Sequence, residues 1–305
     1  MKLKNIKNFR DILLIFDKAF YQLLMRSRTT FIMEKDWDNL IILDGCRYDM
    51  FKKNNSIPGK LEYIYSRGSS TGHFLAENFS AKYFPDTVYI TANPLVNYYV
   101  EDSFYEVVPV WKDGWYEPYN TVLPGTMVDY AIRGNKEFPD KRLIIHFMQP
   151  HFPFIDKQMR RIIGEHEGIL SRNLLYGKET KHTQKVWTLL QAGRIKRNTV
   201  WDAYNKNLII VLEQVKNLLL ELKGKTIISS DHANLFGEWL FPIPLKEYGH
   251  PGGLYKKDLI KVPWLIIEAV ERKVIRKEGG IKKKSTAEKT EDEAIKEKLK
   301  ALGYL

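Results

Sequence analysis

The chain has 305 residues, of which 44% are hydrophobic and 13% aromatic, and it carries a formal net charge of +11. This length and composition exclude a disordered or disulfide-stapled protein and fit one large α/β domain or one domain with appendages. The single cysteine, Cys46, excludes an internal disulfide and a zinc site built from several cysteines, and it is compatible with a reducing compartment.

The positive charge is concentrated in residues 1–35, 157–200 and 271–305, which together carry +16 and leave −5 for the rest. An acidic centre with basic extensions is typical of a cation-binding core whose extensions meet phosphate groups of a lipid, a polymer or a nucleic acid. Solubility explains the same charge equally well. The chain has no basic motif interleaved with aromatic residues of the kind that nucleic-acid readers use, so we rank a nucleic-acid partner low.

The first predicted element is an amphipathic helix within residues 5–28, where charged residues interrupt an apolar repeat. No apolar run approaches the roughly 20 residues that a membrane span needs, and no cleavage site of a secretory signal follows. We favour docking of this helix onto the domain, with attachment to a membrane surface as the alternative. In the absence of a signal we expect a cytoplasmic protein, with peripheral membrane contact as an option.

Two buried strands are predicted to end in an acidic residue. The apolar run 39–43 ends at Asp44, and Gly45 then lets the backbone turn, while a second run ends at the adjacent pair Asp231 and His232. Carboxyl ends of parallel strands open into the crevice where α/β sheets bind ligands, so this pair suits a divalent cation. The alternative is a turn aspartate beside a surface histidine. Arg47 is expected to order the loop after the first strand together with Asp49.

A hydroxyl cluster follows a shorter strand over residues 61–65. Ser69, Ser70 and Thr71 stand before a helical pattern, so by the ordinary rule one of them is the N-cap. The functional alternative is that backbone N–H groups and the positive end of the helix dipole favour an alkoxide, or an anionic ester, at such a hydroxyl.

The middle of the chain holds two predicted strands, over residues 88–92 and 105–110. The loop 111–120 is rich in Trp and Tyr, and it either lines a pocket or packs in the core. A further strand over residues 142–148 contains His146, which we interpret as a hydrogen-bonded core histidine.

His151 follows that strand between two prolines, which force an extended loop and hold its imidazole in one direction. His166 and His182, in the basic helical stretch, are interpreted as surface residues. His250 lies between a glycine and a proline in a loop of small residues, which can fold over a pocket and bring an imidazole to it.

The last third of the chain reads as an α/β unit. An amphipathic helix over residues 201–222 feeds the strand before Asp231, and a final strand spans residues 262–267. Beyond residue 271 the composition of mixed charges and few apolar residues predicts a frayed helix or a disordered tail.

The order of these motifs resembles the alkaline phosphatase-like superfamily, in particular its sulfatase and lipoteichoic-acid-synthase branch. Five motifs occur in the family's order between residues 40 and 267. They are a strand ending in Asp44, the hydroxyl cluster, His151-Phe-Pro, Asp231-His232, and Gly249-His250 followed by Tyr255 and Val262-Pro263. The resemblance implies an α/β fold with a mostly parallel central sheet and helices on both faces. The domains would be an N-terminal amphipathic helix (1–35), a catalytic domain (36–270) with a basic helical insertion (157–200), and a charged tail (271–305).

The resemblance also implies a role for each residue. Asp44, Asp231 and His232 would bind a divalent metal, and the nucleophilic hydroxyl would complete the site and form a covalent enzyme ester. His151 and His250 would hold the ester oxygens, protonate the leaving group, or belong to a second metal site. One metal is preferred over two.

The departures from the family pattern narrow the prediction. The chain lacks the Cys-x-Pro-x-Arg motif of sulfatases, and Cys46 is not in the nucleophile position, which leaves Thr71, then Ser70, as nucleophile. Leu43 takes the place of a second acid beside Asp44, which argues against calcium, and His232 favours zinc or manganese.

The sequence therefore predicts a metal-dependent phosphoesterase or phosphotransferase acting on an anionic ester of a glycan, a polymer or a lipid. A sulfuric ester hydrolase is the alternative within the family. A basic nucleic-acid-binding protein or a non-catalytic interaction protein is the alternative from another class.

Overall fold

A computed structural model describes residues 9–163 and 186–277. Its centre is a seven-stranded sheet in the order β2-β11-β8-β1-β7-β3-β4. The strands are β1 (Asn39–Leu43), β2 (Lys60–Tyr65), β3 (Phe84–Thr91), β4 (Phe104–Pro109), β7 (Arg142–Phe147), β8 (Thr226–Ser229) and β11 (Lys261–Ile267). The prediction of a mostly parallel sheet is confirmed, since only β11 runs antiparallel to its neighbours β8 and β2.

The inner strands are buried on both faces because they are runs of branched apolar residues. All five residues of β1 are buried, and its register pairs Ile41 with Ile145 of β7 and with Ile228 of β8. A strand covered on both faces reads as a continuous apolar run rather than an alternating one, which is why this part of the sheet could be predicted.

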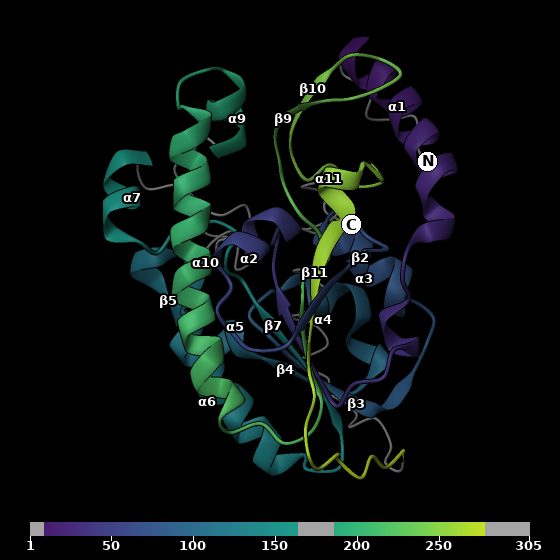
Figure 1. The fold of residues 1–305 in the computed structure, drawn as a ribbon, viewed down its shortest axis with the longest axis vertical. Helices are drawn as coiled ribbons and strands as arrows, with labels where there is room; N and C mark the ends of the chain where they lie inside the picture. The colour runs from purple at the N-terminus through teal and green to yellow at the C-terminus, as the bar shows by residue number, and fades with distance from the viewer. Residues whose placement is uncertain (1–8, 164–185, 278–305) are drawn as a thin grey trace, which may run out of the picture.

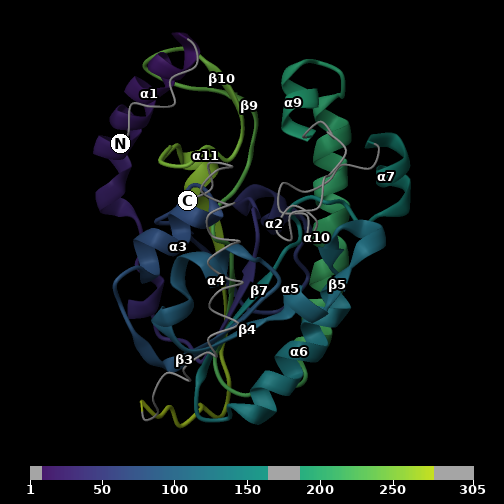
Figure 2. The same ribbon diagram turned by 180° about the vertical axis from the view of Figure 1, so that it is seen from behind.

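Helices cover both sides of the sheet (Figure 1). α6 and α10 lie on one side and α3 on the other, and the view from behind agrees (Figure 2). The helices are α1 (Phe9–Met25), α2 (Tyr48–Asn54), α3 (Thr71–Phe79), α4 (Leu95–Val100), α5 (Val110–Asp113), α6 (Pro124–Glu137), α7 (Lys157–Ile163), α9 (Val186–Gln191), α10 (Arg197–Leu219) and α11 (Lys257–Ile260).

Two small hairpins stand outside the main sheet. One pairs β9 (Leu235–Trp239) with β10 (Lys246–Gly249), and the other pairs β5 (Trp115–Tyr116) with β6 (Thr121–Val122). The first hairpin lies beside α1 in both ribbon views (Figures 1 and 2). The second begins within the aromatic loop 111–120, for which the sequence predicted no strand.

The segment after β11 departs from the sequence prediction. Residues 271–277 were expected to be frayed or disordered, but Arg272 pairs with Asp36 and Asp38, and the Arg276 N–H donates to the carbonyl of Asp140. These contacts attach the segment to the amino-terminal edge of the sheet, and composition alone does not reveal them. Residues 278–305 of the predicted tail, and His166 and His182, lie outside the described residues.

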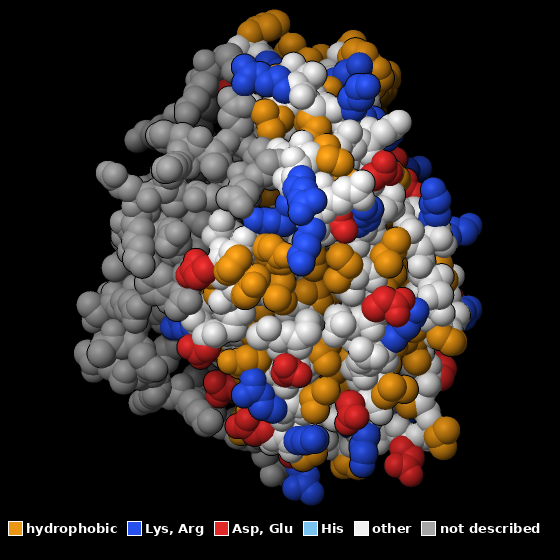
Figure 3. All heavy atoms as spheres, turned by 90° about the vertical axis from the view of Figure 1, so that its left-hand side faces the viewer, with side chains coloured by type: hydrophobic (Ala, Val, Ile, Leu, Met, Phe, Trp, Pro, Cys, Tyr) orange, Lys and Arg blue, Asp and Glu red, His pale blue; other side chains and the backbone are white. Residues whose placement is uncertain are grey.

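Hydrophobic side chains reach the surface in several places. Figure 3 faces the side of α7 and α10 and shows them in the middle of that face and at its upper end. Among the described residues, no helix is both long enough and apolar enough to cross a membrane.

Candidate metal and ester-transfer site

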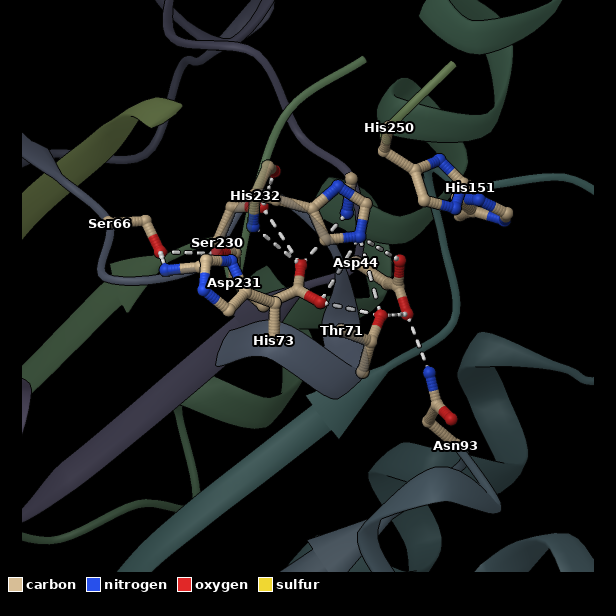
Figure 4. A network of polar contacts seen from close by, with 12 residues as sticks. Asp44, Ser66, Thr71, His73, Asn93, His151, Ser230, Asp231, His232 and His250 are labelled. Atoms are coloured by element: carbon tan, nitrogen blue, oxygen red, sulfur yellow. Dashed lines mark hydrogen bonds and ion pairs between the residues drawn. The ribbon is translucent and has the colours of Figure 1, made fainter. Parts of the chain in front are cut away.

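Four neighbouring parallel strands bring polar side chains to one edge of the sheet. Asp231 follows β8, Asp44 follows β1, His146 is near the end of β7, and Asn93 follows β3. Figure 4 shows Asp44, Asp231 and Asn93 turned toward a common centre with Thr71. The strand order therefore gathers residues that are up to 187 positions apart in the chain, counted between Asp44 and Asp231.

Thr71 lies between the two carboxylates. Its Oγ1 donates to Asp231 Oδ2 at 2.8 Å and lies 3.4 Å from Asp44 Oδ2. His232 Nε2 completes the group at 3.3 Å from Thr71 Oγ1, 3.4 Å from Asp231 Oδ2 and 3.6 Å from Asp44 Oδ1. The structure thus brings together the four residues that the sequence placed around one cation.

The charges in this group are not balanced by the described chain. Asp44 and Asp231 are 2% and 0% exposed, and no described Lys or Arg forms an ion pair with either one. Burial raises the pKa of Asp44, but contact with His146 and the fields of His151 and His232 outweigh it, so the pKa lies below its usual range. Two buried carboxylates without a paired cation are expensive, and a bound metal ion would supply the missing charge.

The spacing of the donor atoms also fits a small metal ion. Tetrahedral ligands about 2.0–2.2 Å from zinc lie roughly 3.3–3.6 Å from one another, because that is the edge of the tetrahedron. The distances from His232 Nε2 to Thr71, Asp231 and Asp44 are 3.3, 3.4 and 3.6 Å, and Thr71 Oγ1 lies 3.4 Å from Asp44 Oδ2. Only the distance from Thr71 Oγ1 to Asp231 Oδ2 among these donor pairs is shorter, at 2.8 Å, because a hydrogen bond joins the two atoms. The residues present therefore fit a divalent metal bound by oxygen and nitrogen.

His146 is not the satisfied core histidine that the sequence predicted. It is fully buried, its Nδ1 lies 3.0 Å from the Tyr89 hydroxyl, and its Nε2 has no hydrogen-bond partner in the described structure. That nitrogen lies 3.6 Å from Asp44 Oδ2, and Asp44, His146 and Asp231 offer ligand atoms within 4.8 Å of one another. His146 is thus an additional candidate ligand, or a donor that holds Asp44.

Three further contacts determine which ring nitrogen of the neighbouring histidines carries the proton. The Nδ1 atoms of His151 and His232 each lie 2.7 Å from a backbone carbonyl, and His250 Nδ1 lies 2.7 Å from Asn234 Oδ1. Because each of these oxygens can only accept, Nδ1 carries the proton in all three rings and Nε2 is the nitrogen that can accept or ligate. Fixing the remote nitrogen in this way is typical of metal-binding and phosphate-contacting imidazoles.

The three imidazoles form one group at the mouth of the site. The ring centroids of His232 and His250 are 4.6 Å apart, and His151 lies 5.0 Å from His250. Burial lowers the pKa of His151. The Asp44 carboxylate raises this pKa and the His232 ring lowers it, and the net result is a pKa below the ordinary value. Figure 4 shows His151 and His250 on one side of the carboxylates, beyond His232.

The start of α3 presents Thr71 to the carboxylates. Ser70 occupies the N-cap position, but its side chain makes no capping hydrogen bond, so the ordinary capping interpretation fails for it. Ser69 instead donates through Oγ to the Pro251 carbonyl at 3.0 Å, and its N–H contacts His73 Nδ1 at 3.3 Å. The loop before α3 is therefore held by the loop that carries His250.

The group opens into a cavity of about 340 Å³. Its polar wall includes Asp44, Thr71, His151 and His250. Its apolar wall is formed by Leu95, Tyr99, Trp115, Met148, Phe152 and Pro153. Both the aromatic loop and the helix after β3 contribute to that wall, so part of the aromatic loop lines the pocket while Trp111 packs in the core. The cavity is large enough for an ester with an apolar substituent.

Gly45 and Arg47 shape the loop after Asp44. Gly45 has a φ of +67°, and a Cβ there would lie 2.6 Å from Asn234 Nδ2 and 3.1 Å from the His151 ring. The prediction for Arg47 is confirmed, because it pairs with Asp49 at 2.8 Å and with Glu238 at 2.9 Å. This loop is therefore fixed from both sides.

Sequence reasoning missed two amides at this site. Asn93 donates to Asp44 Oδ2 at 2.8 Å, and Asn234 links His250 to the Gly45 carbonyl, to which it donates at 3.1 Å. Asn93 follows a predicted strand, so the rule that identified Asp44 could have found it. Asn234 could not be found in this way, since its role depends on a contact with a loop 189 residues away.

No family model and no curated protein matches this chain. Solved structures resemble it at low identity. The integral membrane lipooligosaccharide phosphoethanolamine transferase A of Neisseria meningitidis has a TM-score of 0.49 at 14% identity, over 76% of this chain and 47% of that one. The chain thus spans about half the length of that transferase.

Two more solved structures resemble this chain. The periplasmic domain of EptC from Escherichia coli, in complex with zinc, has a TM-score of 0.47 at 12% identity, covering 76% of this chain and 72% of that one. A protein of the alkaline phosphatase superfamily from Vibrio parahaemolyticus has a TM-score of 0.42 at 13% identity, covering 81% and 63%.

Proposed function

We propose that the protein is a metal-dependent transferase or hydrolase of phosphate esters that works through a covalent Thr71 ester. The observation that carries the proposal is the convergence of Thr71 Oγ1 with two buried carboxylates that no described Lys or Arg neutralises. A structural hydroxyl needs no such surroundings. A nucleophile that must lose its proton does.

Asp44, Asp231 and His232 would hold the metal, with His146 as a further candidate. When bound, a divalent ion supplies positive charge that favours the alkoxide form of the hydroxyl and shields the charge of the ester. Zinc or manganese is the proposed ion, because imidazole together with carboxylate is a ligand set that these metals accept.

Thr71 would attack the phosphorus. Its O–H proton leaves toward Asp231 Oδ2, the acceptor at 2.8 Å, a new oxygen–phosphorus bond forms, and the bond from phosphorus to the leaving oxygen breaks. Water or an acceptor alcohol then attacks the same phosphorus and gives its proton to the imidazole that protonated the leaving oxygen. The bond between phosphorus and Thr71 Oγ1 breaks, and Thr71 takes its proton back from Asp231. Ser70 lines the same cavity and is the alternative nucleophile.

His151 and His250 would bind the ester oxygens and protonate the leaving oxygen. Both line the cavity, and both have Nδ1 held by an acceptor, so each ring would need a second proton, on Nε2, to donate to an ester oxygen or to the leaving oxygen. A second metal at these two imidazoles is the alternative role. The apolar wall of the cavity favours an ester that carries an apolar or aromatic group, such as a lipid-linked one.

The test is metal analysis of the purified protein together with activity on aryl phosphate, aryl phosphodiester and aryl sulfate, for the wild type, Asp231→Ala and Thr71→Ala. We expect about one bound zinc or manganese ion per chain, and hydrolysis of a phosphate ester that falls at least about 10³-fold in both variants. Asp231→Ala should also lose the metal.

Three results would contradict the proposal or a part of it. A wild type without metal and without activity on all three esters would refute it, while preference for aryl sulfate would replace phosphate by sulfate. If Thr71→Ala keeps full activity and Ser70→Ala loses it, the nucleophile assignment is wrong and the metal site stands.

A further inference from the structure

Helix α1 has two apolar faces, and only one of them is used in the fold. On the inner face Leu14 and Tyr21 pack against the cluster of Leu235 and Leu240, and Met25 packs with Tyr255. The buried Asp17 accepts from the Ile243 N–H at 2.9 Å. This face confirms the prediction that the helix docks onto the rest of the chain.

The outer face of α1 is apolar and open to solvent. Phe9, Ile12, Phe16 and Leu23 are 73, 39, 59 and 84% exposed. Their spacing of three, four and seven residues places them on one side of a helix, opposite the docked face. A helix that only docks needs one apolar stripe, so the second stripe has no role in the described fold.

The hairpin of β9 and β10 extends this stripe. Phe241 makes an edge-to-face contact with Phe20 of α1 at a centroid distance of 5.4 Å. Phe241 is 62% exposed and Trp239 is 60% exposed. We call these residues, namely Phe9, Ile12, Phe16, Leu23, Trp239 and Phe241, the α1–hairpin face. Figure 1 shows α1 and the β9–β10 hairpin side by side at its upper end.

Apolar faces built from separate elements mark interaction sites, because soluble surfaces rarely gather large aromatic side chains. The charges around this one indicate its partner. Lys246 lies over the Trp239 ring at 5.1 Å, the exposed Arg28 follows the helix, and the sequence before it carries Lys2, Lys4 and Lys7. Basic residues beside an amphipathic helix with aromatic residues on its apolar side are typical of binding to anionic lipid.

We propose that the α1–hairpin face binds the surface of a lipid bilayer that carries anionic headgroups. α1 lies in the plane of the interface, with Phe9, Phe16 and Phe241 inserted among the acyl chains and Lys246 near the headgroups. From Phe9 to Leu23 the stripe is about 21 Å long at the helical rise of 1.5 Å per residue, so it offers several side chains to one membrane. The proposal goes beyond the ester-transfer function and does not depend on it.

The test is cosedimentation of the full chain with vesicles of phosphatidylcholine alone, and of phosphatidylcholine with roughly 30% phosphatidylglycerol. The variant Phe9→Ser/Phe16→Ser/Phe241→Ser removes three inserted side chains. The control is Leu220→Ser, which removes a side chain that is 85% exposed and lies outside the face. Thermal unfolding and activity on a soluble aryl phosphate check that the variants remain folded.

We expect the wild type and the control to bind the anionic vesicles, with binding that weakens as salt rises. The triple variant should bind about 1,000-fold more weakly, since each of its three buried phenylalanines contributes roughly tenfold. No vesicle binding by the wild type, or equal binding by the triple variant, would overturn the proposal. So would a wild-type dimer that the triple variant converts to monomer, because a second copy of the chain would then cover the face.

Discussion

The sheet carries a pair of acids at each end, and the two pairs are neutralised differently. At the amino-terminal edge Asp36 and Asp38 bind Arg272 at 2.7 and 2.5 Å, and Lys225 adds a contact to Asp36 at 3.3 Å. At the carboxyl edge Asp44 and Asp231 contact only hydroxyl, amide, imidazole and backbone N–H groups in the described chain.

This difference separates a structural cluster from a functional one. An acid paired with an arginine has the charge it needs, and its contacts attach residues 271–277 to the sheet. Acids that are buried without a cation lower stability unless an ion or a ligand joins them. Clusters of buried ionisable groups of this kind are found mainly at active sites, where the reaction needs them.

The largest contrast is expected between neutral variants of the buried acid at each edge. Asp44→Asn should lower kcat/KM at least about 10³-fold, because it removes a carboxylate that would hold the metal. Asp38→Asn should leave kcat/KM unchanged and lower the free energy of unfolding by roughly 2 kcal/mol, through loss of its bonds to Arg272 and the Lys225 N–H. Steady-state kinetics and urea unfolding measure both, and equal loss of activity in the two variants would erase the distinction.

A smaller change should follow from crowding the loop after Asp44. Gly45→Ala places a Cβ against Asn234 and the His151 ring, and displacement of these groups by about 1 Å should lower kcat roughly 100-fold. Gly193→Ala is the matched control, since Gly193 has nearly the same φ of +68° and no atom of the described residues lies within 4 Å of the new Cβ. The control should only lose about 1 kcal/mol of stability from backbone strain. Full activity in Gly45→Ala would show that the loop can move without consequence.

Removal of the metal should destabilise the carboxyl edge alone. With metal at about 100 times its Kd, binding contributes roughly 2.7 kcal/mol, so a chelator should lower Tm by about 5–10 °C. The Tm of Asp231→Asn should not respond to the chelator, whereas that of Asp36→Asn should respond like the wild type. Scanning calorimetry with and without chelator distinguishes these cases, and an unchanged wild-type Tm would contradict the metal site.

The smallest effect is the acid sensitivity of the amino-terminal edge. Hydrogen bonding to Arg272 outweighs burial and lowers the pKa of Asp36 to about 2. Because this folded pKa lies below the ordinary value of about 3.8, the pair stabilises the fold above that pH and is lost as the pH falls toward 2. Asp36 is largely exposed, so solvent screening keeps the effect below about 1 kcal/mol.

The measurement is urea unfolding of the wild type and Asp36→Asn at several pH values between 5 and 2. The wild type should lose its advantage over the variant across this window. An advantage that stays constant down to pH 2 would show that the Arg272 contact does not stabilise the fold through the charge of Asp36.

The sequence by itself determined the parallel core and the order of the candidate residues. Runs such as Ile41-Ile42 and Ile144-Ile145 report burial on both faces of a strand, and an acid after such a run must lie at the carboxyl edge of the sheet. Asp44, Asp231 and His232 could be grouped on these local grounds, and Thr71 and His250 through the resemblance.

Only the tertiary structure decided what depends on contacts between distant segments. His146 looks like any core histidine in its strand, and its unsatisfied Nε2 toward Asp44 becomes visible only when β7 lies beside β1. The attachment of Arg272 at the opposite edge and the exposed second stripe of α1 arise in the same way. Local patterns specify which face of an element is apolar, but packing decides which polar atoms and which apolar faces are left without a partner.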